Sequence, residues 1–215
     1  FLEMTKRPPK PLRVAFATEI VGLGKADASY EKAVRETARS LSERGHSVEP
    51  ACPKIDDITE PFTTIWQAMA SLSGLPLEAL DRMNTWNAQR NVQLPEYWRS
   101  MSALQAIARR IVSFSDKYDV LVLPTYLHST IRIGEWDNLS PAEMLQKIIT
   151  WIAPAPPFNV TGQPVVSFPM GCDENGLPVG VQLVGKPADE GTIVALAAQL
   201  EAARSPWKIP DFANI

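Results

Sequence analysis

The stretch from Pro157 to Gly185, PFNVTGQPVVSFPMGCDENGLPVGVQLVG, indicates the core of the fold. Two apolar runs, VVSFPM and VGVQLV, lie on either side of the polar turn DENG, where Gly176 suits a tight reversal of the chain. The pattern predicts a β-hairpin whose strands belong to a buried sheet. The stretch offers no catalytic group, so we expect it to be the scaffold of a site whose chemistry lies elsewhere.

Composition narrows the class of protein. The 215 residues are 45% apolar and carry a formal net charge of −3, which suits a globular protein and gives no basic footprint for nucleic acid. The chain has no apolar run of membrane-spanning length. Two distant cysteines and two histidines predict neither a zinc site nor a disulfide framework, which favours a cytoplasmic protein. The proline-rich residues 1–11 are expected to be an extended linker, and the start at Phe1 suggests a piece of a longer protein.

Residues 12–54 read as a βαβ unit. The apolar run LRVAFA predicts a strand, DASYEKAVRETARSLSERG predicts a helix capped by Asp27 or Ser29, and HSVEPA predicts a second strand. Apolar residues recur in the helix at spacings of three and four, and Gly45 is its expected end. A strand, a helix and a strand in this order predict a parallel pair with a right-handed crossover.

The rest of the chain divides into residues 55–118, which are predicted to be helical, and residues 119–215, which contain the remaining core strands and helices. Trp98 and Met101 share a helical period with Leu104, Ile107 and Ile111, so we expect them to face a core. YDVLVLPT is the clearest strand, and SPAEMLQKIITWI and DEGTIVALAAQLEAAR are predicted helices. The predicted fold class is therefore α/β, with a mixed twisted sheet flanked by helices.

Two short motifs invite a catalytic or nucleotide-binding interpretation. GLGKAD, residues 22–27, lies between a strand and a helix, where a dinucleotide fingerprint would lie. Asp27 stands where that motif needs a small residue, and its charge would repel a pyrophosphate, so a plain connection is favoured over a nucleotide-binding module. SPWK, residues 205–208, matches S-x-x-K, but Pro206 is unsuited to the single helical turn that the motif requires.

Three polar positions are candidates for a ligand cleft. His128 and Tyr126 follow the carboxyl end of the VLVLP strand, where open α/β sheets bind ligands. Asn159 belongs to an Asn-x-Thr-Gly-x-Pro segment that is predicted to be a loop; its side chain either shapes a turn or borders the cleft. His46, between Gly45 and a strand, is expected to be a solvated turn residue.

The segments YDVLVLPT, FNVTGQPVVSFPMG and GLPVGVQLVGKPADEGTIVALAAQLE together resemble the C-terminal part of an amidase-signature enzyme. The opening βαβ unit fits the same resemblance, which runs in order along nearly the whole chain and is only generic in residues 55–118. The resemblance implies the C-terminal part of the amidase-signature fold and hydrolysis of a carboxylic amide by a Ser–cis-Ser–Lys triad, because serine needs a neighbouring base to become a good nucleophile.

The chain lacks the glycine- and serine-rich stretch that carries the family's nucleophile, and the lysine upstream of it. Both are expected in an N-terminal half, so this chain alone is expected to be inactive. The resemblance makes Tyr126, His128 and Asn159 candidates for the wall of the substrate cleft. The partners it implies are a small-molecule amide and the N-terminal catalytic half.

Nearby aromatic residues suggest an apolar acyl group, and we expect no cofactor. Uncovered strands predict a homo-oligomer when the chain is alone. A catalytically inactive interaction domain on the same scaffold remains the alternative.

Overall fold

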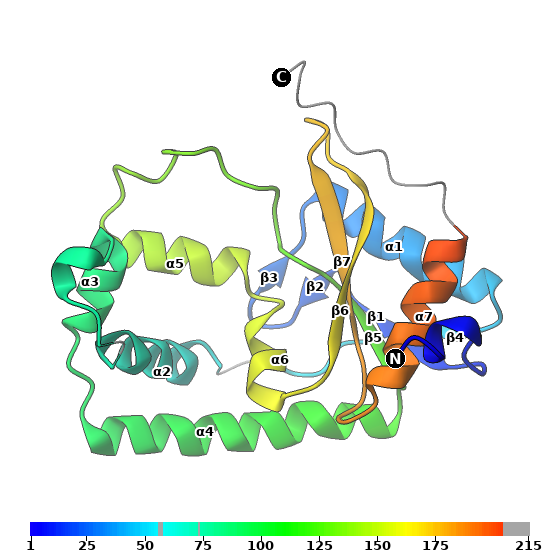
Figure 1. The fold of residues 1–215 in the computed structure, drawn as a ribbon, viewed down its shortest axis with the longest axis horizontal. Coiled ribbons are helices and arrows are strands. Elements are labelled where there is room, and N and C mark those ends of the chain that lie inside the picture. Colours follow the sequence, from blue (N-terminus) through cyan, green and yellow to red (C-terminus); the bar gives the residue numbers. More distant parts are fainter. Residues whose placement is uncertain (56–57, 73, 204–215) are drawn as a thin grey trace.

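The computed structural model describes residues 1–55, 58–72 and 74–203 of the chain. Its centre is a five-stranded sheet in the order β4-β1-β5-β7-β6 (Figure 1). The strands are β1 (Arg13–Phe16), β4 (Ser47–Pro50), β5 (Val120–Pro124), β6 (Val165–Cys172) and β7 (Pro178–Val184). β1 runs parallel to β4 and β5, whereas β7 is antiparallel to β5 and β6. The predicted α/β class with a mixed sheet is confirmed.

The βαβ unit forms as the sequence predicts. Helix α1 (Ala28–Glu43) connects β1 to β4, and the side chain of Asp27 accepts a hydrogen bond from the backbone N–H of Tyr30. A short antiparallel pair, β2 (Glu19–Ile20) and β3 (Gly24–Lys25), lies between β1 and the helix. The buried residues of α1 recur at spacings of three and four, and they are Tyr30, Ala33, Val34, Thr37, Ala38 and Leu41.

Helices cover both faces of the sheet. α1 and α7 (Glu190–Ala202) pack with the core that contains Val14, Val122 and Leu183. α4 (Leu94–Val112) and α6 (Pro156–Thr161) pack with a second core that contains Ala15, Leu121 and Val184. β5 is buried along its whole length because it lies between these two cores, as its uninterrupted apolar run predicts.

The helical segment forms a lobe beside the sheet (Figure 1). It contains α2 (Thr59–Ser71), a 3₁₀ turn η2 (Leu77–Ala79), α3 (Arg82–Ala88) and α4, which ends in η3 (Ser113–Asp116). α5 (Pro141–Trp151) packs against α3 and begins with a complete capping box between Ser140 and Glu143. The prediction for Trp98 is wrong, because its side chain is 69% exposed. Leu104, Ile107 and Ile111 are buried as the periodicity predicts, and Ser100 is buried with them.

The predicted hairpin is present and consists of β6 and β7. Asp173 closes its turn, because one carboxylate oxygen accepts from the backbone N–H groups of Asn175 and Leu177. Gly176 has a φ of 78°, a conformation that glycine adopts without steric cost. The hairpin therefore forms from its own turn chemistry as well as from burial.

Two predictions of local backbone structure are wrong. Residues 1–11 are not extended throughout: Met4–Lys6 form the 3₁₀ turn η1, and Met4 packs on α7 at Gly191. The segment around Asn159 is not a loop but the short helix α6, which ends at Gly162 with a φ of 66°.

His46 is not solvated either. It is 5% exposed, because its ring bridges the backbone of Leu12 and the side chain of Gln199. Within the described residues, no helix is long and apolar enough to cross a membrane.

Candidate active-site cleft

The segment that follows β5 is held from two sides. On one side, the backbone N–H of Asp27 donates to the carbonyl of Leu127, and the side chain of Asp27 accepts from the N–H of Ser129. On the other side, the N–H of Leu127 donates to the carbonyl of Trp151, and the Trp151 indole donates to the carbonyl of His128. The N-terminus of α1 and the last residue of α5 therefore fix this segment at the carboxyl end of β5.

The two candidates on this segment, Tyr126 and His128, both lie against Trp151. The Tyr126 and Trp151 ring centroids are 4.8 Å apart with planes 31° apart. The His128 ring is stacked on the same indole, with centroids 5.7 Å apart and planes 16° apart. Trp136 approaches Trp151 edge-on at 6.1 Å. The structure thus gathers these four rings into one aromatic cluster.

A cleft of about 400 Å³ opens beside this cluster. In Figure 1 the connection from β5 to α5 passes above α5 before it turns back into that helix, and part of this connection lines the cleft. Lys147 on α5 places its ammonium group 5.8 Å from the centroid of the Trp136 ring. The lining residues are His128, Ser129, Thr130, Ile131, Glu135, Trp136, Gln146, Lys147 and Thr150. The volume suits a small-molecule ligand.

The β6–β7 hairpin and α1 contribute ionisable groups near this segment. Burial raises the pKa of Tyr30 to about 12, and the negative charge of Asp27 adds to the effect, so the phenol stays neutral. Burial works to raise the pKa of Asp173, but the hydrogen bond from the Leu177 backbone N–H, together with the nearby Ser129 hydroxyl, holds it below its ordinary value. Asp173 is therefore a carboxylate that closes the hairpin turn and lies near the segment that contains His128.

Asn159 lies apart from this cleft. It is exposed on α6 and is not among the residues that line the cleft beside His128. α6 packs against α4, on the opposite face of the sheet from α1. The structure therefore brings Tyr126 and His128 together and leaves Asn159 on a separate surface.

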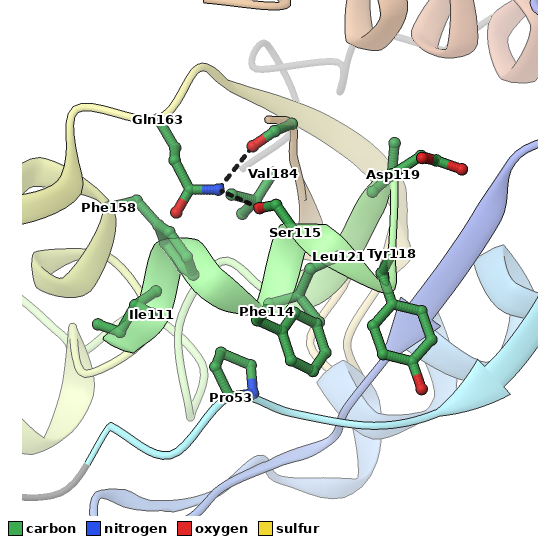
Figure 2. A pocket seen from close by; sticks show the side chains of 12 residues that line it. Pro53, Ile111, Phe114, Ser115, Tyr118, Asp119, Leu121, Phe158, Gln163 and Val184 are labelled. Carbon is green, nitrogen blue, oxygen red and sulfur yellow. Dashed lines mark hydrogen bonds between the residues drawn. The ribbon is translucent and has the colours of Figure 1, made fainter. Parts of the chain in front are cut away.

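Figure 2 shows a second pocket, under α6 at the amino end of β5. Its volume is about 10 Å³, which is room for about one water molecule. The Gln163 amide donates to the carbonyl of Gly185 at 2.7 Å and to the hydroxyl of Ser115 at 3.5 Å. This pocket is a structural junction and is too small for a substrate.

Asp119, at the rim of this junction, binds Arg13 at 3.0 Å and Lys186 at 2.8 Å. Partial burial works to raise the pKa of Asp119, but hydrogen bonds from these two cations outweigh it and keep the pKa well below its ordinary value. Asp119 is therefore ionised at neutral pH and connects β1 to the end of β7.

The structure does not favour a nucleotide-binding role for the motif GLGKAD, residues 22–27. The carboxylate of Asp27 occupies the N-terminus of α1, where a bound pyrophosphate would have to lie. SPWK lies outside the described residues. No group of three or more His, Cys, Asp or Glu side chains suited to a metal ion occurs in the part of the chain that the structure describes.

Sequence reasoning missed Lys147 and Glu135 as lining residues of the cleft, and Asp27 as the group that holds Ser129. No local pattern marks these residues, because they reach the cleft from α5, from a long connection and from the start of α1. Trp136 and Trp151 could be noticed only as aromatic residues near the expected cleft.

Comparison with known proteins identifies the family. The model of the family described as Amidase matches residues 1–194. A "Putative amidase" of Synechocystis sp. is 39% identical over 201 residues, which are 94% of this chain and 40% of that protein. "Putative amidase AmiB2" of Mycobacterium bovis is 31% identical over 227 residues, covering 96% of this chain and 46% of its own length. This chain thus spans less than half the length of these relatives.

Comparison with solved structures shows that the fold is shared with amidase-signature enzymes. The structure of 6-aminohexanoate cyclic dimer hydrolase superposes with a TM-score of 0.85 at 26% identity, covering 95% of this chain and 47% of the hydrolase. A bacterial aryl acylamidase of the amidase-signature family superposes with a TM-score of 0.76 at 17% identity, which shows a shared fold. The order of strands, the hairpin and the match over residues 1–194 together establish that this chain belongs to the Amidase family and has the fold of the C-terminal part of amidase-signature enzymes.

Proposed function

We propose that this chain is the C-terminal part of an enzyme that hydrolyses a carboxylic amide, and that it forms one wall of the substrate cleft. The observation that carries the proposal is the family match over residues 1–194, supported by the superposition on 6-aminohexanoate cyclic dimer hydrolase. The cleft at the carboxyl end of β5 is where an α/β sheet binds its ligand. We expect the complete protein to be cytoplasmic and to need no cofactor.

The reaction we propose follows the Ser–cis-Ser–Lys mechanism, with all three groups outside this chain. The nucleophilic serine attacks the amide carbonyl, the second serine passes the proton to the lysine, and the amine leaves with a proton returned by the same route. Water then hydrolyses the acyl-enzyme, releasing the carboxylic acid and restoring the serine. On this proposal residues 1–215 supply binding surface and no reacting group, so the chain alone is inactive.

We assign His128, which lines the cleft, to the substrate wall, and we add Tyr126, which is not among the lining residues but packs on Trp151 beside His128. We assign Asn159 to a surface that faces the N-terminal half, since it is exposed on α6 and away from the cleft beside His128. The rings of His128 and Trp136, which line the cleft, suit an apolar segment of substrate, and the structures of the cyclic dimer hydrolase and the aryl acylamidase make aryl acylamides and cyclic oligoamides sensible first candidates.

The partner that we propose is the N-terminal catalytic half, which would add to the sheet along β6. Among the described residues β6 is an edge strand of the sheet and pairs with β7, and Val165 at its start is 38% exposed. An edge strand can serve as a template for another strand. Without the N-terminal half we expect two copies of this chain to associate, which light scattering after size-exclusion chromatography would detect. A stable monomer at tens of micromolar would contradict this expectation.

The decisive experiment compares the polypeptide that contains both halves with the 215-residue chain on a panel of aryl, aliphatic and cyclic amides. We expect turnover only from the complete polypeptide, and loss of turnover when its nucleophilic serine is replaced by alanine. Hydrolysis by the highly purified 215-residue chain, or survival of activity after the serine replacement, would refute the proposed mechanism.

A further inference from the structure

The hydrogen bonds of His128 determine which of its ring nitrogens is free. Nδ1 lies 2.8 Å from the carbonyl oxygen of Ser129. A carbonyl oxygen only accepts hydrogen bonds, so Nδ1 must carry a proton. In the neutral imidazole the other nitrogen, Nε2, is then an acceptor. No hydrogen bond to Nε2 occurs within the described residues, although the His128 ring lines the cleft.

The ring is also held in place. It stacks on Trp151 at 5.7 Å, and the Trp151 indole donates to the carbonyl of His128 itself. The next residue, Ser129, is fixed by its N–H bond to the carboxylate of Asp27. His128 is thus a positioned acceptor, which loses little conformational freedom when a ligand binds.

The other polar groups nearby are partly engaged. One carboxylate oxygen of Glu135 accepts from the backbone N–H of Arg132, and the hydroxyl of Thr150 donates to the carbonyl of Gln146 within α5. Lys147 offers only donors and lies over Trp136. In the neutral ring, Nε2 of His128 is therefore an acceptor beside the aromatic cluster, in a position to recognise a donor.

We infer that His128 selects substrates that carry a hydrogen-bond donor, an N–H or O–H group, outside the amide that is cleaved, next to an apolar segment that lies along the aromatic cluster. The inference rests on the proposed amide hydrolysis and goes further by naming the substrate class. A bound substrate that covers Nε2 excludes water from it, so an analogue without the donor leaves this acceptor unpaired and binds less well.

The test uses the complete enzyme and three para-nitroanilides: those of N-acetyl-6-aminohexanoic acid, of its N-methyl analogue and of hexanoic acid. The first has a donor in the acyl chain, the second has the same chain with the donor replaced by a methyl group, and the third has none. We expect wild type to prefer the first over the second by about threefold to tenfold in kcat/KM, mostly through KM.

His128→Phe keeps a flat ring on Trp151 and removes the acceptor, so it should abolish this preference. His128→Gln places an amide oxygen near the position of Nε2 and should restore part of it. His128→Leu, which has no acceptor, is the second comparison if His128→Phe folds poorly. Thr150→Val is the matched comparison in the same cleft: it removes a hydroxyl whose proton is donated to Gln146 within α5, and because the inference assigns recognition of the donor to His128, this variant should keep the wild-type preference.

The outcomes separate the two proposals. If no amide is hydrolysed by the complete enzyme, the proposed function fails and this inference fails with it. If amides are hydrolysed but His128→Phe keeps the wild-type preference, only the role of His128 is overturned. Faster hydrolysis of the hexanoyl substrate than of the donor-bearing substrate by wild type would also overturn it.

Discussion

His46 makes a strong prediction about stability, because a single ring joins three elements of the fold. The backbone N–H of Leu12, at the entry to β1, donates to Nδ1 at 3.1 Å. Nε2 lies 2.9 Å from the side-chain oxygen of Gln199 on α7, and because Nδ1 is the acceptor, Nε2 carries the proton and donates. His46 itself precedes β4, so its ring links β1, β4 and α7.

Replacing His46 by alanine would leave two polar groups without partners and a void in place of the ring. A buried backbone N–H left unpaired costs about 1–3 kcal/mol, and the lost side-chain hydrogen bond to Gln199 about 0.5–1.5 kcal/mol. Gln199 can turn toward water, which reduces the second contribution. We therefore expect His46→Ala to lower the free energy of unfolding by about 2–4 kcal/mol, which is a large part of the stability of an ordinary domain.

Urea unfolding followed by tryptophan fluorescence would measure the change. His46→Asn places an oxygen near the position of Nδ1 and can still accept from Leu12, so it should recover part of the loss. Gln199→Ala removes only the other partner and should cost less than His46→Ala. If His46→Ala changes the free energy of unfolding by less than 0.5 kcal/mol, roughly the size of an ordinary surface substitution, the assigned hydrogen bonds do not contribute as we argue.

Three further changes test other parts of the structure. Burial raises the pKa of the Cys52 thiol to about 11, whereas Cys172 is exposed on β6, so a thiol reagent at neutral pH should modify Cys172 rapidly and Cys52 only after unfolding; rapid labelling of Cys172→Ser would contradict this. Asp119→Asn should lower the free energy of unfolding by about 1–2 kcal/mol at pH 7. The pKa of Asp119 is depressed in the folded protein, so its contribution is present above about pH 4 and declines as the pH falls further; a difference from wild type that stays constant down to pH 2 would be inconsistent with it. Gly180→Ala would place a Cβ atom 2.7 Å from the hydroxyl of Thr125 and should cost about 1–3 kcal/mol in thermal or urea unfolding, with partial rescue by Thr125→Ala; additive effects of the two changes would argue against a direct clash.

Local patterns in the sequence predict most of the fold. The buried face of α1 follows from the spacing of its apolar residues, and the β6–β7 hairpin follows from the DENG turn between two apolar runs. Both features depend on neighbours in the chain, so periodicity and turn chemistry are sufficient to find them. The parallel pairing of β1 with β4 then follows from the strand–helix–strand order of this unit.

The wrong predictions concern residues whose surroundings come from distant parts of the chain. His46 follows a glycine in a turn, which predicts exposure, but α7 covers it with a residue 153 positions later. Trp98 continues the periodic pattern of α4, yet nothing in the described residues covers the first turns of that side of the helix. The rule that a period marks a buried face holds only where another element is present to bury it.

The candidate cleft, like these wrong predictions, depends on residues that are distant in the sequence. Tyr126 and His128 could be chosen from the sequence because they follow a strand, but their usefulness depends on Asp27 and Trp151, which hold that segment from either side. Neither partner is marked by a motif. The sequence predicts Asp27 to be a helix cap and Trp151 to be a packing residue, and each has that role in addition to holding this segment. Asp27 caps α1 with one carboxylate oxygen and fixes Ser129 with the other, so the element that starts the βαβ unit also positions the cleft. Position in the sheet can therefore be predicted from local sequence, whereas the orientation of a binding side chain depends on groups that only the folded chain brings together.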